Sequence, residues 1–487
     1  MDELDLPAGT LIVKSDQPSR RMAHAFLGFD TRPDPSYLKI EREELENHGS
    51  SRFYDVTAWN LPMSFGLESY WVDMITDVKV ASETPTRAKN GVDWKSRPKY
   101  GYVIDFSSAS VYDVMARLFE QNCHLRVARK PFDLHGHSYR PGAILLRGHE
   151  NPDNLGEILE KLARDFDVTI RPAQTASVGK VGPDLGGPKF VLLHAPRVAL
   201  SADAMSNSAG AVWHLLDYRL KMRVSPVESI GDLRKYNVLI LPGGGAVSDG
   251  VKKWVADGGT LIAFGGAAYT IAKEQSGLSS VRRRRDVLDK LAVYQEDFKR
   301  EQQADEIEID FDDLWGDREA ARAESRKTDP KQGKVTAKQP AKQAKKSVPS
   351  DDLEQLKRID KWQRIFTPSG VFLKAKIDER QWLGFGLGKF LPVMVGNDTV
   401  LMSMYPTETP VRLVDEDNLR LSGLLWPEAR GRLANSSIAT VEKVGRGQVI
   451  LFASNPTFRG WYPGMERLFL NAVILGPGMG TTQKMPW

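Results

Sequence analysis

The chain has 487 residues, of which 41% are hydrophobic and 27% are charged, a composition typical of globular proteins with about two to four domains. Lys and Arg number 67 and Asp and Glu 63, so the net charge of +4 does not demand a nucleic acid as partner. No apolar run is long enough to span a bilayer, the acidic start MDELDLPAGT is not a signal peptide, and a single cysteine, Cys123, excludes an internal disulfide.

Residues 1–99 are predicted to contain a partial copy of a module that comes later in the chain. The segment LPAGTLIVKSDQPSRRMAHAFLGF parallels RPGAILLRGHENPDNLGEILEKLARDF. Each has a Pro/Gly turn, a short apolar strand, a polar turn and an amphipathic stretch. On this interpretation the first copy lacks its leading strand and helix, and the chain begins in the middle of a domain.

Residues 100–175 are predicted to form a compact β-α-β-β-α-β module. Strands are expected in YGYVIDF, HLRVAR, GAILLRG and DVTIRP, with helices in SVYDVMARLFEQN and NLGEILEKLARDF. Apolar residues in both helical stretches recur at intervals of three and four, which is the stripe of a helix that faces a core.

Residues 188–280 and 353–480 are predicted to form one α/β domain with a doubly wound parallel sheet. Its strand candidates are PKFVLLHA, MRVSPV, NVLILPG and TLIAFG, and helical stretches near residues 211–218 and 247–257 lie among them. The late segment GQVILFAS is expected to complete the same sheet, because VILF suits a strand that is covered on both faces.

Residues 281–352 are predicted to be a charged, largely disordered insert. The stretch KTDPKQGKVTAKQPAKQAKKSVPS has almost no large apolar side chain, so burial cannot offset the entropy of ordering it. Residues 317–349 are therefore expected to be cut first by proteases. A solvated linker is favoured over a nucleic-acid site at Arg282–Arg285, since the charge run lacks aromatic residues.

The sequence predicts neither a catalytic residue nor a metal site. His135 and His137, in LHGHSY, could share a strand face, but no third ligand is evident and no His-Glu-x-x-His occurs. The nucleophile motif Gly-x-Ser-x-Gly is absent, and Cys123 is interpreted as a buried thiol.

Two glycine-rich turns are the candidate ligand-binding loops. Each follows a predicted strand and precedes a predicted helix, where ligands of open α/β sheets bind. The candidate residues are Gly243, Gly244, Gly245, Gly265 and Gly266. A third loop, GFGLGK at residues 384–389, is one residue short of a phosphate loop and has Phe390 in place of the magnesium-binding hydroxyl.

The segment RFYDVTAWNLPMSFGLESYW resembles one that follows the catalytic domain in large bacterial zinc carboxypeptidases of the carboxypeptidase A-like family. NVLILPGG, ADGGTLIAFGGAA, PSGVFLKAKID, LSGLLWPEA and VGRGQVILFASNPTFRGW are similar, in order, to stretches of that same C-terminal region. The resemblance covers nearly the whole chain except the insert. The family's zinc ligands and general base lie in an upstream peptidase domain without a counterpart here, so the resemblance implies no cofactor in this chain.

The doubly wound domain also resembles the class I glutamine amidotransferase fold, which is flavodoxin-like. In that superfamily a cysteine nucleophile occupies the turn between a strand and a helix. The corresponding turn here is FGGAAYT, where Gly266 and Ala267 stand in the nucleophile's place. Acyl transfer at that turn would need a thiolate or an activated hydroxyl.

These observations favour a non-catalytic accessory or scaffold region of a zinc carboxypeptidase-like protein, which binds peptide or glycan. Two alternatives stay open: a fragment of an active zinc metallocarboxypeptidase, and a small-molecule sensor built on the amidotransferase-like domain. A peptidase domain encoded upstream or in a separate chain is the expected partner. The resemblance implies a periplasmic or extracellular location, and no membrane span is expected.

Overall fold

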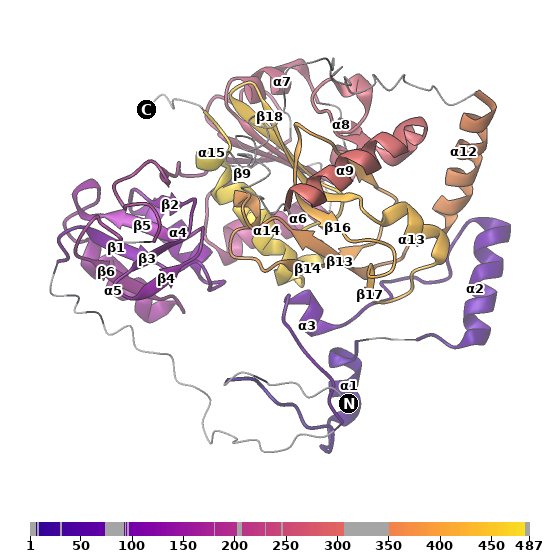
Figure 1. Ribbon diagram of the computed structural model, residues 1–487, viewed down its shortest axis with the longest axis horizontal. Helices are drawn as coiled ribbons and strands as arrows, with labels where there is room; N and C mark the ends of the chain where they lie inside the picture. The colour runs from indigo at the N-terminus through magenta and orange to yellow at the C-terminus, as the bar shows by residue number, and fades with distance from the viewer. Residues whose placement is uncertain are drawn as a thin grey trace, which may run out of the picture. The chain divides into compact units, whose positions relative to one another are not determined.

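The computed structural model of the chain describes residues 6, 9–29, 32–73, 92, 94, 97–179, 181–201, 207–228, 230–244, 247–305 and 350–482 (Figure 1). Two compact units are distinguished, Met1–Asp286 with Lys361–Trp487, and Val287–Asp360. The second unit contains η5 (Leu288–Lys290) and α9 (Leu291–Asp305), and α12 (Ser350–Gln363) begins in it. The predicted protease-sensitive stretch, residues 317–349, lies outside the described residues.

A five-stranded antiparallel sheet forms the core of the small module. Its strand order is β6-β1-β5-β2-β7, and helices α4 and α5 follow β1 and β5 in the chain. A hairpin, β3 with β4, is inserted between β2 and β5. The elements are β1 (Gly101–Ile104), α4 (Val111–Glu120), β2 (Arg126–Ala128), β3 (Phe132–Leu134), β4 (His137–Tyr139), β5 (Ile144–Arg147), α5 (Leu155–Asp165), β6 (Ile170–Ala173) and β7 (Phe190–Leu192).

The strand β7 corrects the predicted domain boundary at residue 188. The segment PKFVLLHA does contain a strand, but it pairs with β2 of the small sheet and not with the parallel sheet. Phe190 is 1% exposed and meets the ring of Phe132 edge-on at 5.1 Å. Burial of this aromatic side chain in the core of the small module explains the pairing, because aromatic residues supply much of the energy of a core.

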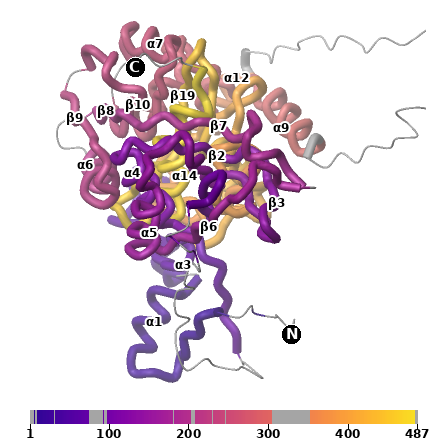
Figure 2. Tube along the Cα trace, turned by 90° about the vertical axis from the view of Figure 1, so that its left-hand side faces the viewer, coloured from indigo at the N-terminus to yellow at the C-terminus, as the bar shows by residue number. Residues whose placement is uncertain are grey.

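The second sheet of the molecule is mixed, with twelve strands, and one half of it is parallel. The order in this half is β9-β8-β10-β11-β19. The strand β8 was not predicted, whereas β19 pairs in parallel with β11, as the burial of VILF predicts. Figure 2 shows β19, in yellow, in the same sheet as β10 and β8. The bounds are β8 (Val198–Ser201), β9 (Val224–Val227), β10 (Val238–Leu241), β11 (Thr260–Phe264) and β19 (Gly447–Phe452).

Helices follow the parallel strands at the predicted places. The helix α6 (Asn207–Trp213) continues as a π-helix, η2 (His214–Arg219). The N-terminus of α7 (Asp249–Ala256) is capped by Ser248, whose hydroxyl accepts from the N–H of Val251. The remaining helices of this unit's second half are α8 (Gly266–Ile271), α13 (Pro427–Leu433), α14 (Pro463–Ile474) and α15 (Gly476–Met479). Short 3-10 helices are η1 (Gly148–Glu150), η3 (Glu274–Ser276), η4 (Arg284–Asp286), η6 (Arg364–Phe366), η7 (Trp382–Gly384) and η8 (Phe458–Gly460).

Beyond β19 the large sheet becomes antiparallel. Its order continues as β18-β16-β13-β14, and β12, β15 and β17 pair beside this path. The strands are β12 (Arg282–Arg283), β13 (Val371–Ile377), β14 (Phe390–Val395), β15 (Leu401–Met402), β16 (Glu408–Leu413), β17 (Arg420–Ser422) and β18 (Ser437–Val444). The fold is therefore mixed α/β, with a large mixed sheet.

The sheet also reaches into the segment expected to be a disordered insert from residue 281 onward. The strand β12 pairs with β15, and Val281 is fully buried. Just before it, the N–H of Ser280 donates to the carboxylate of Glu442 on β18 at 2.9 Å. A buried apolar side chain and this hydrogen bond hold the start of the segment in place, so the ordered chain extends beyond residue 280.

The N-terminal part of the chain forms three helices, α1 (Arg20–Leu27), α2 (Pro35–His48) and α3 (Leu61–Ser64). The strand expected in TLIV, as part of a repeat of the small module, does not form. Leu11 is 83% exposed there, and Val13 is 56% exposed. An isolated strand needs a neighbour to satisfy its backbone, and among the described strands none pairs with this segment.

A buried polar junction joins the small module to α14, which covers the large sheet. Asn471 of α14 donates to the carbonyls of Leu383 and Phe385 at 2.9 and 2.8 Å. Its side-chain oxygen accepts from the hydroxyl of Tyr112, on α4, at 2.8 Å. Asn471 is fully buried and Tyr112 is 1% exposed. No described helix is long and apolar enough to cross a membrane.

Candidate ligand-binding cleft

Residues 52–60, here called the strap, cross the antiparallel half of the large sheet. At the middle of the strap the N–H of Thr57 donates to the carbonyl of Gly370 at 3.0 Å. The hydroxyl of Thr57 donates to the same carbonyl at 2.9 Å and accepts from the N–H of Leu424 at 3.0 Å. The strap includes YDVTAWN, the segment that carries the family resemblance, and it is anchored by backbone groups more than 300 residues away.

Two glycines make room for the strap. At Gly370 φ is +76°, and a Cβ there would lie 2.3 Å from Cγ1 of Val56. At Gly423 φ is +94°, and a Cβ would lie 2.9 Å from Oγ1 of Thr57. Both positions therefore need glycine for backbone conformation and for space. The fully buried Ala58 lies beside Gly423, where a Cβ would come 3.0 Å from the Cβ of Ala58.

The strap is also fixed at its far end. Asn60 accepts from the N–H of Met63 at 2.7 Å, which caps α3, and its amide donates to the carbonyl of Leu27 at 3.0 Å. The ring of Trp59 stacks on Trp461, with centroids 5.7 Å apart and planes within 13°. These contacts at its middle and far end hold the strap in place, and it forms one wall of a cleft.

That wall bounds a cleft of about 490 Å³ at the carboxyl end of β19. Three other segments complete the cleft, namely the turn before β13, the turn after β14 and the loop after β19. The lining residues are Phe53, Tyr54, Asp55, Val56, Thr367, Pro368, Ser369, Gly370, Met394, Gly396, Asn397, Ser454, Asn455, Phe458 and Arg459. The size is within the range of small-molecule sites in proteins.

An ion pair crosses the cleft. Nη1 of Arg459 donates to both oxygens of Asp55, at 2.8 and 3.1 Å, and the guanidinium lies 5.0 Å from the centroid of the Phe458 ring. Arg459 has φ of 53°, the left-handed region that costs a non-glycine residue energy. Strain of this kind gathers at binding sites, where the surrounding structure enforces it.

The rim of the cleft carries an uncovered aromatic ring. Tyr54 is 99% exposed, although its neighbour Phe53 packs edge-on against Tyr37 at 5.2 Å. A tyrosine combines a flat apolar face with a hydroxyl, and both are open to solvent at this position.

Two asparagines shape the floor of the cleft. The side-chain oxygen of Asn397 accepts from the N–H of Thr399 at 2.9 Å, and that of Asn455 accepts from the N–H of Thr457 at 2.9 Å. The amide of Asn455 donates to the hydroxyl of Ser208, on α6, at 3.1 Å. These bonds hold the two loops that line the cleft.

The glycines predicted to bind a ligand come together elsewhere, at the carboxyl ends of β10 and β11. A Cβ at Gly266 would lie 3.1 Å from Cα of Gly244 and 3.4 Å from the carbonyl oxygen of Gly243. Gly265 makes the turn between β11 and α8 with φ of 60°. The two loops thus pack against each other, and Gly245 lies outside the described residues. None of the four described glycines lines the cleft.

Cys123, His135 and His137, the other residues considered in the sequence, all lie in the small module. Burial raises the pKa of Cys123 to about 11, which keeps the thiol protonated. His135 is in the turn of the β3–β4 hairpin, with φ of 50°, and His137 is on β4. Among the described residues, no group of three His, Cys, Asp or Glu side chains could hold a metal ion.

The loop GFGLGK and the arginines of Arg282–Arg285 also make contacts within the protein. A Cβ at Gly386 would lie 2.8 Å from Nη2 of Arg467. Arg282 donates to the carbonyl of Ser279 at 2.6 Å, and Arg283 pairs with Asp286 through Nη2 at 2.6 Å. These internal contacts occupy two of the four arginines considered for nucleic-acid binding.

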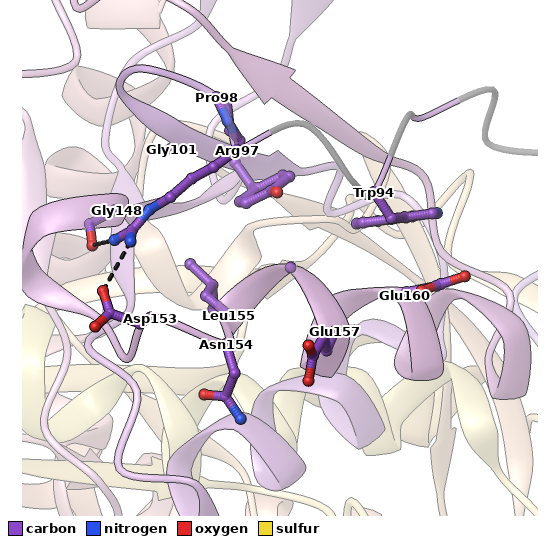
Figure 3. Close-up of a pocket in the computed structure, with 12 residues that line it drawn as sticks. Trp94, Arg97, Pro98, Gly101, Gly148, Asp153, Asn154, Leu155, Glu157 and Glu160 are labelled. Carbon is purple, nitrogen blue, oxygen red and sulfur yellow. Dashed lines mark hydrogen bonds and ion pairs between the residues drawn. The ribbon is translucent and has the colours of Figure 1, made fainter.

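Figure 3 shows a second cavity, of about 390 Å³, in the small module. Arg97 closes one side of it, where its guanidinium donates to Asp153 at 2.7 Å and to the carbonyl of Gly148 at 2.9 Å. Trp94 lies at the other side and stacks on Tyr102 at 5.9 Å.

Sequence reasoning singled out the strap by resemblance but did not predict the cleft. Its walls come from segments around residues 54, 369, 396 and 458, and only the folded chain brings them together. An exposed tyrosine beside an aspartate is too common a pattern to indicate a site by itself.

Neither a protein-family model nor a curated protein matches the sequence. Among solved structures, a ThuA-like protein from Bacteroides uniformis is similar over 57% of this chain and 90% of its own, with 11% sequence identity and a TM-score of 0.27. A TM-score this low does not establish a shared fold.

Proposed function

We propose that this chain is a non-catalytic binding protein, the accessory region of a zinc carboxypeptidase-like protein. The turn after β11 supports the non-catalytic part. It has no cysteine or serine, and a Cβ at Gly266 would lie only 3.1 Å from Cα of Gly244, so a side chain there would be crowded. The order β9-β8-β10-β11-β19 matches the flavodoxin-like order 2-1-3-4-5, which supports the amidotransferase-like reading of this half of the sheet.

The cleft behind the strap is the proposed binding site, and an oligosaccharide is the proposed ligand. The observation that carries this is the exposed ring of Tyr54 next to the Asp55–Arg459 pair. A flat aromatic face can cover the C–H face of a sugar ring. A carboxylate that accepts and a guanidinium that donates, side by side, suit two neighbouring hydroxyl groups.

The strap connects this proposal to the family resemblance. Its buried centre, Thr57 and Ala58, is part of the packing of the large sheet, which supports reading the segment as an integral element of a non-peptidase region. On this proposal, zinc and the catalytic base belong to a separate peptidase domain, and the present chain contributes substrate recognition.

Binding is tested by isothermal titration calorimetry with soluble oligosaccharides, including cellobiose, chitobiose and maltose, and with a set of short peptides. Tyr54→Ala is expected to weaken oligosaccharide binding by about tenfold, the loss of one aromatic contact of about 1.4 kcal/mol. Asp55→Asn keeps the shape of the side chain and removes its charge, and should also weaken binding.

Tyr405→Ala is the matched control, because Tyr405 is 85% exposed and does not line the cleft. Its affinity should equal that of the unmodified chain. Binding of peptides but not sugars, or sugar binding that Tyr54→Ala leaves unchanged, would refute the proposed ligand or its site.

A further inference from the structure

A groove of about 370 Å³ lies beside α1, and it shares no residue with the cleft. Three parts of the chain line it, namely α1 itself, the segment that precedes this helix, and Trp71. The lining residues are Val13, Lys14, Ser15, Arg20, Arg21, Ala23, His24, Leu27 and Trp71. We call this site the α1 groove.

The apolar part of the α1 groove is held in place by contacts of Trp71. Its indole N–H donates to the carbonyl of Leu27 at 3.3 Å, and its ring centroid lies 5.4 Å from that of His24. Ala23 and Leu27 are one helical turn apart, so they lie on the same face of α1. Trp71 nevertheless stays 48% exposed. An indole ring left open beside other apolar side chains is a surface on which a further apolar group can pack.

The charge of the α1 groove is positive. Lys14, Arg20 and Arg21 line it, and none of its lining residues is Asp or Glu. Asp16 is the nearest acidic residue in the sequence, and it does not line the groove. Within the part of the chain that the structure describes, no carboxylate pairs with the three cations. Their charges are therefore free to attract an anionic group.

The segment that enters the groove has open backbone groups. Leu11, Ile12 and Val13 are in no helix or strand, and no described residue forms a hydrogen bond with their N–H or carbonyl groups. The side chains of Leu11 and Val13 are exposed as well. The main chain of an added peptide can bond to such backbone groups, while its side chains enter a neighbouring groove.

From this combination we infer that the α1 groove binds an acidic peptide segment that carries an aromatic or branched apolar side chain. The carboxylates of the peptide face the three cations of the groove. Its apolar side chain packs on Trp71 and Leu27, and its main chain bonds to the backbone of residues 11–13. This site is separate from the proposed oligosaccharide cleft and goes beyond the function proposed for it.

Two other occupants fit the groove less well. An anionic lipid bilayer offers negative charge and apolar chains, but its hydrocarbon has no groups that bond to the open backbone, and burying unpaired N–H and carbonyl groups in it is costly. In a symmetric dimer built across the groove, each copy would bring the same cations to the interface, where like charges repel.

The test measures peptide binding to the full-length chain by fluorescence anisotropy. The probe is a labelled synthetic peptide in which Glu alternates with Ile around one Phe, and its control is the same peptide with Lys in place of Glu. Only the Glu peptide should bind saturably. Its affinity should fall with added salt, since the screening length shrinks from about 10 Å at 0.1 M to about 3 Å at 1 M.

Three variants locate the site. Trp71→Ala is expected to weaken binding by about tenfold, because it removes the open aromatic face. Arg20→Glu and Arg21→Glu should each weaken it by about three- to tenfold, because an exposed attraction becomes a repulsion. Lys253→Glu is the control, since Lys253 is an exposed lysine of α7 that does not line the groove. It should bind as the unmodified chain does, and thermal melts establish that each variant is folded.

Sedimentation with phosphatidylserine vesicles and sedimentation velocity of the chain alone test the other two occupants. The inference is overturned if the Glu peptide does not bind, if the Lys peptide binds equally well, or if all three groove variants bind as the Lys253→Glu control does. Vesicle binding or dimerisation that Trp71→Ala abolishes would also overturn it, because the groove would then have another occupant.

Discussion

Replacing Asn471 by leucine is expected to be among the most destabilising single changes in the chain. Leucine has the same branched arrangement of side-chain heavy atoms but carries methyl groups in place of the amide, so the change removes the hydrogen bonds and adds some volume. It would leave the carbonyls of Leu383 and Phe385 and the hydroxyl of Tyr112 without their partner, all in the buried junction between α4 and α14.

The expected loss in the free energy of unfolding follows from the cost of each buried polar group that is left without a hydrogen-bond partner. An unsatisfied buried group costs about 1–3 kcal/mol, and three are created. The Tyr112 hydroxyl can keep a long contact with the carbonyl of Arg467, at 3.4 Å, which reduces its share. The free energy of unfolding is therefore expected to fall by about 3–5 kcal/mol, a large part of the stability of an ordinary domain.

Urea unfolding followed by far-UV circular dichroism and tryptophan fluorescence measures this change. Tyr112→Phe, which removes a single bond, should cost about 1 kcal/mol, and the double variant should cost less than the sum, because the two side chains interact directly. A loss below about 1 kcal/mol for Asn471→Leu, or strict additivity in the double variant, would refute the assignment of the junction.

Three further predictions follow from other parts of the fold. Gly266→Ser should lower the free energy of unfolding by about 1–3 kcal/mol and create no hydrolase activity, whereas Gly210→Ala, with open space around it, should be neutral or slightly stabilising in urea titrations. The thiol of Cys123 should not react with a disulfide reagent at pH 8 until the chain is unfolded. Because its folded pKa is about 11 and its ordinary value is 9.0, the folded state holds this proton more tightly, so its contribution to stability should be lost as pH rises from about 9 to 11 in pH-dependent melts. Deleting residues 447–487 should abolish the cooperative unfolding of the parallel strands, and a truncated chain that melts at the original temperature would show that β19 is dispensable.

Sequence reasoning succeeded where the residues of a segment are enough to indicate that it is buried. VILF predicts a strand covered on both faces, and β19 lies between β11 and β18 with all its residues buried. The apolar spacing of α4 and α5 likewise predicts their buried faces.

Sequence reasoning failed where the place of a strand depends on the strand with which it pairs. In RVALSA the apolar run is three residues long, too short to predict β8, yet the sheet buries Val198, Ala199 and Leu200. PKFVLLHA reads as a strand but does not reveal which sheet it joins. The cleft could not be predicted because its walls are distant in sequence, and the predicted glycines lie in two loops that pack against each other.

The position of β19 has a consequence for how the protein is made. Phe264, at the end of β11, and Gly447, at the start of its neighbour β19, are separated by about 180 residues. At the usual pace of translation the ribosome takes on the order of 10–40 s to add them. During that time β11, a strand that is fully buried in the folded protein, is the open edge of a nascent sheet, a surface prone to pair with other chains. The protein is thus expected to depend on a chaperone, or on slow commitment to its fold, until the last tenth of the chain has left the ribosome.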